Sequence, residues 1–433
     1  MMMANAEYLA AYPVLSREWP GQADSWLQAW REDNWRRFSA AGFPAARDED
    51  WRYTNLGVLR KALYLPVAAP ARPDITAYCL PDAWRAVFVN GLFSLELSEL
   101  QGLPDAVSFQ ALTLASPREL TAWQDYLGRA GGEQAHNILA FGGAWLTDGL
   151  LLQIAAGGHL DRPLQILHVV TAPQALAATR HVVALAAGAS AQIVETFVGQ
   201  TPDYFTASAA EAFVGPGASL EWIKLQSESD KAQHYAGLFC QIAEGGSLTQ
   251  HNFALGGQMA RTDVQCDLAR AAGCRLYGLS LGAGVRQVDN FTRIVHREPA
   301  GISRQYYKGI MDGRARGVFQ GRVLVEQAAQ QTDSQMQNRN LLLSADAEVD
   351  SKPQLEIYAD DVKCSHGLTV GQLDEQSLFY LQSRGLGREE ARHLLTQAFA
   401  NEMLAFIEAE PLRAWVRDRL AARFPALAED LRL

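Results

Sequence analysis

Residues 188–199 read GASAQIVETFVG, a small turn followed by a strand-like run, and the same unit returns four more times. The turns are GAS at 188–190, GAS at 217–219, GGS at 245–247, AGC at 272–274 and GIS at 301–303. Their third residues lie 29, 28, 27 and 29 positions apart. A fixed period of this length is typical of stacked units that cannot bury their apolar faces alone.

Each period holds two strand-like runs and two turn signals, and no long helical window interrupts residues 150–373. Glycine suits tight corners because it reaches positive φ without steric cost. This pattern favours a β-helix or a comparable β-solenoid. A β-sandwich or meander with strands at similar intervals is the alternative that the repeat leaves open.

The first third of the chain has a different periodicity. Apolar residues between Ser16 and Ala40 recur at helical spacing among charged ones, which predicts an amphipathic helix. Asn90-Gly91 joins two short strand-like runs and is a strong hairpin signal. Leu120–Leu127 reads as a further helix.

Beyond residue 373 the pattern becomes helical, with a break at Gly385-Leu386-Gly387 and a second stop at Pro411. We therefore divide the chain into a mixed, largely helical region at 1–149, a β-helix core at 150–373 and a helical domain at 374–433. These last helices are expected to cover the end of the solenoid, since an uncovered rung is an aggregation edge.

Charge and composition exclude several classes. The net charge of -10 disfavours nucleic-acid binding, and no basic patch offsets it. The start of the chain has no basic or apolar signal region, and no run approaches the roughly 18 apolar residues of a membrane span. An odd number of scattered cysteines fits a reducing cytoplasm: Cys79, Cys240, Cys266, Cys274 and Cys364.

Chemistry-bearing motifs are sparse, because the sequence contains neither a phosphate-binding glycine loop nor a G-x-S-x-G elbow. The exception is Lys363-Cys364-Ser365-His366. On a strand, Cys364 and His366 point to one face about 6.5–7 Å apart, which suits a soft transition metal. Lys363 is a neighbouring cation able to lower the thiol pKa, although its side chain starts on the opposite face of the strand. Such a pair also arises by chance, and two ligands cannot close a tetrahedral site, so a real site needs ligands from another chain.

Four stretches together resemble the SufB/SufD family of the SUF iron–sulfur cluster assembly system, and its SufD branch in particular. They are GIMDGRARGVFQG at 309–321, QQTDSQMQNRNLLLS at 330–344, KPQLEIYADDVKCSHG at 352–367 and FYLQSRG at 379–385. EDWRYTNL at 49–56 is a weaker likeness near the start.

The resemblance implies a mainly β fold, a right-handed parallel β-helix flanked by helical regions. It implies pairing with a SufB-like subunit through the late strands, and a transient iron–sulfur cluster at that interface beside His366 and Cys364. It further implies a SufC-like ABC ATPase bound by the C-terminal helices, for which we select Phe379, Tyr380, Leu381, Arg384 and Gly385. Whether a flavin binds stays open.

These observations predict a non-enzymatic assembly scaffold, with a homodimer as a further possibility for the isolated chain. The alternative is a β-helix polysaccharide lyase or hydrolase, a likeness of fold alone. Such enzymes are usually exported and need clustered carboxylates or basic residues on one solenoid face. The sequence offers neither an export signal nor such a cluster.

Overall fold

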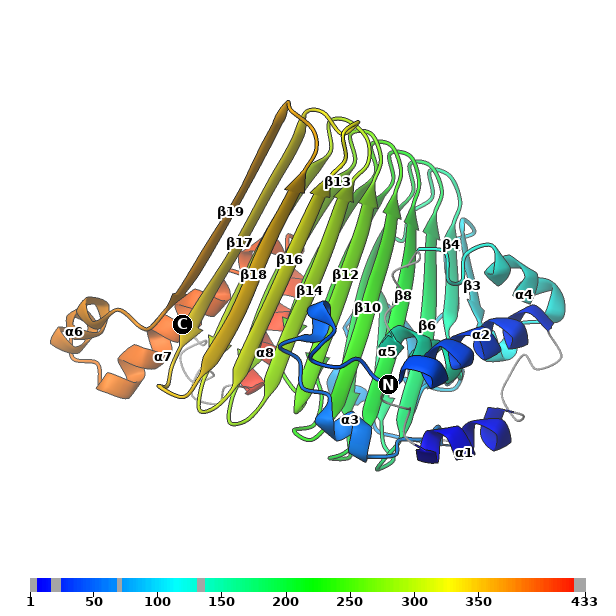
Figure 1. Ribbon diagram of the computed structural model, residues 1–433, viewed down its shortest axis with the longest axis horizontal. Helices are drawn as coiled ribbons and strands as arrows, with labels where there is room; N and C mark the ends of the chain where they lie inside the picture. The colour runs from blue at the N-terminus through cyan, green and yellow to red at the C-terminus, as the bar shows by residue number, and fades with distance from the viewer. Residues whose placement is uncertain (1–5, 17–24, 68–71, 131–136, 424–433) are drawn as a thin grey trace.

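The computed structural model describes residues 6–16, 25–67, 72–130 and 137–423. The protein is mainly β, a parallel β-solenoid of about eight turns with helices towards both ends of the stack (Figure 1). The predicted fold class is confirmed and the sandwich alternative is wrong, because neighbouring strands of the core run parallel. Residues 17–24 of the predicted first helix lie outside the described residues.

Two sheets form the solenoid, and successive strands alternate between them. In the described chain, the ten-stranded sheet has the order β19-β17-β15-β13-β11-β9-β7-β5-β1-β2 and the nine-stranded sheet has the order β18-β16-β14-β12-β10-β8-β6-β4-β3. The strands are β1 Trp84–Val89, β2 Leu92–Phe93, β3 Val107–Ala111, β4 Leu150–Ile154, β5 Leu164–Val170, β6 Leu176–Leu185, β7 Ser190–Gly199, β8 Phe205–Val214, β9 Ser219–Ser227, β10 Gln233–Ile242, β11 Ser247–Ala254, β12 Met259–Leu268, β13 Gly273–Gly282, β14 Gln287–His296, β15 Ile302–Met311, β16 Arg316–Val325, β17 Thr332–Leu342, β18 Glu348–Ile357 and β19 Val362–Gly371.

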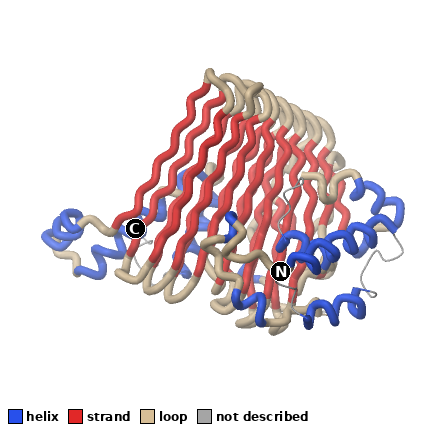
Figure 2. The backbone as a smooth tube through the Cα atoms, viewed as in Figure 1, coloured by secondary structure: helices blue, strands red, loops and turns tan. Residues whose placement is uncertain are grey.

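Helices lie outside the two sheets, as Figure 2 shows in blue. They are α1 Ala6–Leu15, α2 Ser25–Ala41, α3 Gly57–Lys61, α4 Pro117–Gln124, α5 Asn137–Ala144, α6 Glu375–Ser383, α7 Arg388–Asn401 and α8 Glu410–Arg423. The predicted hairpin at Asn90-Gly91 is confirmed as the turn between β1 and β2, with both turn residues at positive φ. Pro411 begins α8, whereas the sequence pattern placed it at the end of the preceding helix.

The repeat in the sequence is the corner that leads from the nine-stranded to the ten-stranded sheet. Gly188, Gly217 and Gly245 occupy its left-handed position, with φ between +62° and +67°. At the next two corners this position belongs to Ala271 and Ala300. Ser247 consequently pairs with Gly273, one residue before the position that the glycine pattern indicates. The predicted alignment of the 245–247 and 272–274 turns is therefore wrong by one residue. The left-handed position of the second turn is occupied by Ala271, which adopts a positive φ at some cost in strain.

The main apolar core fills the space between the two sheets. Inward residues from successive rungs stack in it, including Leu152, Val183, Ile193, Ala212 and Trp222. Parallel pairing in register places each inward residue beside the inward residue two strands later. Three buried free cysteines, Cys240, Cys266 and Cys274, belong to this core.

Each outer face is covered by different helices. Tyr8, Phe38 and Phe141 from the N-terminal helices pack on Phe205 and Tyr235 of the nine-stranded sheet. Met403, Ile407, Trp415 and Val416 pack on Ile223 and Leu225 of the ten-stranded sheet. The C-terminal helices α7 and α8 therefore run along a face of the solenoid. The expectation that the C-terminal helices cover the last rung is wrong, because their apolar residues pack against outward-facing residues of the ten-stranded sheet.

The family-like stretch 49–56 is bound to the outer face of the nine-stranded sheet. The guanidinium of Arg261 lies 3.7 Å from the ring centre of Trp51 and donates to Asp263 Oδ1 and Asp289 Oδ2, both at 2.7 Å. Thr54 also bonds to Asp289. Since all these groups are buried, each charge depends on its partners. The motif is thus a structural anchor for the N-terminal region.

The corner geometry makes a stability prediction. Gly217 has a φ of +62°, and a Cβ added there would meet no atom within 4 Å. Gly217→Ala should therefore lower the free energy of unfolding by backbone strain alone, by about 1–2 kcal/mol. Denaturant unfolding followed by circular dichroism measures it.

Gly273→Ala is the matched control, because Gly273 is not at positive φ and its added Cβ would meet only Ser247 Cβ, at 3.7 Å. We expect no loss of stability in this variant. An equal loss in both variants would contradict the assignment of the corner.

Candidate functional site

The last rung of the solenoid, formed by β18 and β19, is exposed. In the part of the chain that the structure describes, β18 and β19 are the last strands of their sheets, so each has one edge without a neighbouring strand. No residue of β18 or β19 is buried, whereas most residues of β16 are. Unpaired edge N–H and C=O groups readily accept another strand. This end of the molecule is therefore built for a partner.

Cys364 and His366 lie on β19 and face the interior of the solenoid at this open end. Cys364 packs against the main apolar core and pairs with Ser334 of β17. His366 pairs with Met336, another core residue, and two residues along a strand share a face. Cys364 is half-buried and His366 is exposed. A group that covers the last rung would meet both side chains.

The electrostatics of Cys364 differ from expectation. Burial raises the pKa of its thiol, the backbone of Ser334 opposes the shift by hydrogen bonding, and the charge of Asp333 adds to it. Lys363 is exposed and pairs with Asp333 on the opposite face of the strand. The prediction that Lys363 lowers the thiol pKa is thus wrong, because the ammonium and the thiol point to different faces.

A buried hydrogen-bonded chain leads to this site, which the sequence did not reveal. His296 Nε2 lies 2.9 Å from Ser303 Oγ, and Ser303 Oγ donates to Ser334 Oγ at 2.8 Å. Ser303, Ser334 and Cys364 are successive members of one inward column. The chain fixes Ser334 beside Cys364. The signal available in the sequence was only the regular spacing of these residues.

The predicted ATPase contact lies on α6. Phe379 is 73% exposed and Tyr380 is 56% exposed, while Leu378 of the same helix is buried. Leu381 is half-buried. Two large aromatic side chains on an exposed helix face mark a candidate interaction site.

The C-terminal end of α6 is well ordered by local bonds. Gly385 has a φ of +98°, its N–H donates to Gln382 O at 3.0 Å, and the N–H of Leu386 donates to Leu381 O at 3.4 Å. These are the two bonds of a Schellman motif. Arg384 lies 5.2 Å from the ring of Tyr380 and donates to its hydroxyl at 3.3 Å. Gly385 therefore serves to end the helix, and the Arg384 guanidinium lies against the Tyr380 side chain.

The two predicted sites occupy one end of the molecule but remain separate. Only residues 372–374 join the end of β19 to α6 (Figure 1). Asp374 caps α6 by accepting from the Ser377 N–H at 2.9 Å. The strand that holds Cys364 and His366 is therefore joined to α6 by a short connection. Their roles in binding stay predictions.

Fold and open end together define a class: a two-sheeted β-solenoid with an unpaired last rung, suited to assembly with other chains. Comparisons with known proteins agree. Residues 168–399 match the family described as SUF system FeS cluster assembly, SufBD core domain, and residues 2–166 match the SufBD protein N-terminal region.

Two relatives are similar over nearly their whole length. An iron–sulfur cluster assembly SufBD family protein of Synechocystis is 34% identical, over 93% of this chain and 92% of its own. The iron–sulfur cluster assembly protein SufD of Escherichia coli is 33% identical, over 89% of this chain and 90% of its own. The chain therefore belongs to the SufB/SufD family of iron–sulfur cluster assembly proteins. These matches confirm the resemblance and do not support the polysaccharide lyase alternative. In the described residues, no helix is long and apolar enough to span a membrane.

The raised pKa of Cys364 makes a reactivity prediction. The thiolate is the nucleophile, so a thiol with a pKa above its ordinary value of 9.0 should react slowly with iodoacetamide near about pH 8. Asp333→Asn removes a negative charge beside the thiol and should lower its pKa. We expect faster labelling of Cys364 in this variant, measured by peptide mass spectrometry across a pH series.

Asp346→Asn is the control, since Asp346 is an exposed turn residue that is absent from the groups acting on Cys364. Identical labelling profiles in the wild type and in Asp333→Asn would contradict the electrostatic contribution of Asp333.

Proposed function

We propose that this protein is a non-enzymatic scaffold subunit of an iron–sulfur cluster assembly complex, which pairs with a SufB-like subunit and binds a SufC-like ATPase. The observation that carries the proposal is the bare last rung, with Cys364 and His366 facing its open end. Membership of the SufB/SufD family supports it.

Pairing with a second solenoid would use both edges of the last rung. β18 and β19 each offer a row of backbone donors and acceptors, which another strand can extend by β-augmentation. Ile357, Leu368 and Val370 are exposed apolar residues on these strands, and a covering rung would bury them. The same surface in two copies of this chain would give a homodimer when no SufB-like partner is present.

A nascent cluster would be the cargo of this interface. Cys364 and His366 supply a sulfur and an imidazole, both of which iron–sulfur clusters accept as ligands. Two ligands do not complete a cluster site, so the partner subunit would contribute the others. This division of ligands between chains explains why an isolated Cys-x-His pair stands at an edge and not inside a closed pocket.

The ATPase would bind α6 through Phe379, Tyr380, Leu381 and Arg384, with Gly385 holding the end of the helix. Phe379 and Tyr380 have the exposure and size of interface anchors. The three-residue link to β19 gives ATP hydrolysis a route to the last rung. In this arrangement the ATPase performs the chemistry and the scaffold converts it into a change of geometry.

His366→Ala tests the cluster site. In anaerobic co-expression with SufB-like and SufC-like subunits, the variant complex should form normally but carry about a tenth or less of the wild-type iron and sulfide. The reason is that even outer-shell partners of a metal contribute about 10–100-fold to affinity. Iron and acid-labile sulfide are assayed on the purified complex.

Two further variants sharpen this experiment. His159→Ala removes an exposed histidine elsewhere and should retain the full content. Leu368→Lys places a charge on the covered surface and should prevent pairing itself, whereas Leu95→Lys, at a residue exposed far from the edge, should not. Wild-type iron and sulfide in His366→Ala would remove this residue from the mechanism.

Arg384→Glu tests the ATPase contact. An exposed ion pair contributes about 0.2–1 kcal/mol, and reversal turns attraction into repulsion, so affinity for the SufC-like subunit should fall roughly tenfold. Phe379→Ala should weaken binding further, because it removes an aromatic anchor. Isothermal titration calorimetry measures both.

Arg36→Glu, at an exposed arginine of α2, is the matched charge reversal away from α6. Unchanged affinity in Arg384→Glu and Phe379→Ala would place the ATPase elsewhere on the chain.

A further inference from the structure

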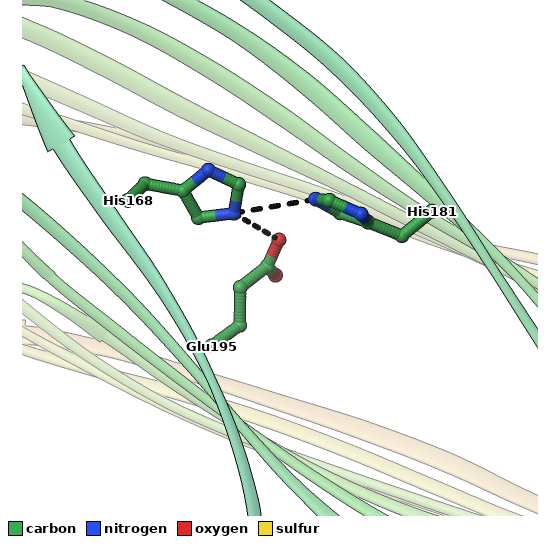
Figure 3. A group of neighbouring side chains, drawn as sticks. All are labelled: His168, His181 and Glu195. Atoms are coloured by element: carbon green, nitrogen blue, oxygen red, sulfur yellow. Dashed lines mark hydrogen bonds and ion pairs between the residues drawn. The ribbon is translucent and has the colours of Figure 1, made fainter. Parts of the chain in front are cut away.

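Three buried side chains with metal-binding atoms converge inside the early rungs. His168 on β5, His181 on β6 and Glu195 on β7 point toward one another from both sheets (Figure 3). His168 Nε2 lies 3.3 Å from His181 Nε2 and 3.6 Å from Glu195 Oε1, and all three atoms lie within 4.8 Å of one another. Ligand atoms of a tetrahedral site with bonds of about 2.0–2.1 Å stand roughly 3.3–3.4 Å apart. The two distances from His168 Nε2 are close to that arrangement, and the third pair, His181 and Glu195, lies within 4.8 Å.

The surrounding core holds these ligands in place. The ring of His168 lies between Phe88 and Phe197, with centroid distances of 5.4 and 4.4 Å. Trp222 Nε1 donates to Glu195 Oε2 at 3.2 Å, which leaves Oε1 directed at the histidines. Exposed fractions of 3%, 0% and 4% for His168, His181 and Glu195 exclude bulk water. Such fixed orientation by neighbours is what a metal site requires.

Proton positions satisfy the two histidines, because the Leu150 N–H donates to His181 Nδ1 and His181 Nε2 then carries the proton that it donates to His168 Nε2. They leave His168 with no proton for Glu195 Oε1 at 3.6 Å. His168 Nε2 cannot donate to Glu195 and accept from His181 at the same time, because one ring nitrogen offers either a proton or a lone pair. A cation between the three atoms accepts all three lone pairs.

The negative charge of Glu195 also lacks a contacting cation. Among the described residues, no lysine or arginine nitrogen lies within 4.0 Å of its carboxylate. Lys224 is buried on the same inner surface, but its Nζ donates to Thr262 Oγ1 at 2.9 Å. Lys224 pairs in register with Glu195 and attracts its charge without contacting the carboxylate, so a bound cation would add the direct contact that Glu195 lacks.

One contact opposes binding. The N–H of Leu150 donates to His181 Nδ1 at 3.3 Å. A metal at Nε2 requires a proton on Nδ1, so this hydrogen bond must open. Its length is at the weak end of the range, and one weak bond is exchanged for three coordination bonds.

We propose that His168 Nε2, His181 Nε2 and Glu195 Oε1 bind one divalent first-row transition ion, Zn²⁺ or Fe²⁺, in a site separate from the proposed cluster interface. Two imidazoles and a carboxylate suit these ions, whereas Mg²⁺ and Ca²⁺ prefer all-oxygen shells. β5 and β7 are neighbours in one sheet and β6 belongs to the other. The ion would therefore cross-link the two sheets near the start of the solenoid, away from β19 (Figure 1).

The experiment uses the full chain. Because the ligands are buried, the protein is refolded in the presence of Zn²⁺, of anaerobic Fe²⁺ or of Mg²⁺, and free metal is then removed. We expect about one retained equivalent of Zn²⁺ or Fe²⁺ per chain by mass spectrometry of the metals, and none of Mg²⁺. The melting temperature should rise with Zn²⁺, since a ligand of the native state stabilises it.

Matched variants locate the ion. Glu195→Gln preserves shape, and His168→Phe preserves the stack between Phe88 and Phe197; both should lose the ion and the thermal response. Trp222→Phe should weaken retention about tenfold, as expected for an outer-shell partner. His366→Ala and Cys364→Ser should retain the ion in full, which separates this site from the cluster interface.

The wild type decides the question even if a variant fails to fold. Absence of a retained Zn²⁺ or Fe²⁺ together with an unchanged melting temperature would overturn the proposal. Wild-type retention in folded Glu195→Gln and His168→Phe would overturn it equally, because the ion would then lie elsewhere.

Discussion

Parallel pairing in register is the constraint from which the rest of this structure follows. From β6 to β17, each strand bonds its backbone to the strands two places before and two places after it, with matching residues side by side. Because the register hardly changes from rung to rung, inward residues stack in columns and outward residues form flat stripes. The columns place Ser303, Ser334 and Cys364 in one line. Insertion of one residue within a strand would turn the side chains that follow it in that strand to the opposite face, out of their columns.

The two ends of the solenoid differ in whether further strands or helices cover them. At the start, β2 and β3 pair antiparallel with β1 and β4 and close the edges of both sheets. At the other end, no strand or helix among the described residues covers β18 or β19. The C-terminal helices could have supplied a cap, but their apolar residues pack on the outer face of the ten-stranded sheet instead. This asymmetry leaves one end of the solenoid as the surface on which we propose assembly.

The interior is not uniformly apolar. A core of leucine, isoleucine, valine and alanine lies beside buried polar groups that find their partners across rungs, such as Asn252 with Asn290 and His296 with Ser303. A buried polar group without a partner would cost more than a hydrogen bond returns, so these groups fix the stacking of their rungs. His168, His181 and Glu195 bring three metal-binding atoms together in this interior, which is the basis of the proposed ion site.

The sequence by itself predicted the solenoid, because a turn of small residues followed by an alternating strand-like run recurs about every 28 residues. It also placed Cys364 and His366 on one face, since that follows from strand geometry alone. Tertiary structure decided the rest. The register at Ala271, the position of α7 and α8, and the open last rung depend on how rungs and helices pack. The meeting of His168, His181 and Glu195 was equally invisible, because three residues on three strands converge only once the strands have stacked.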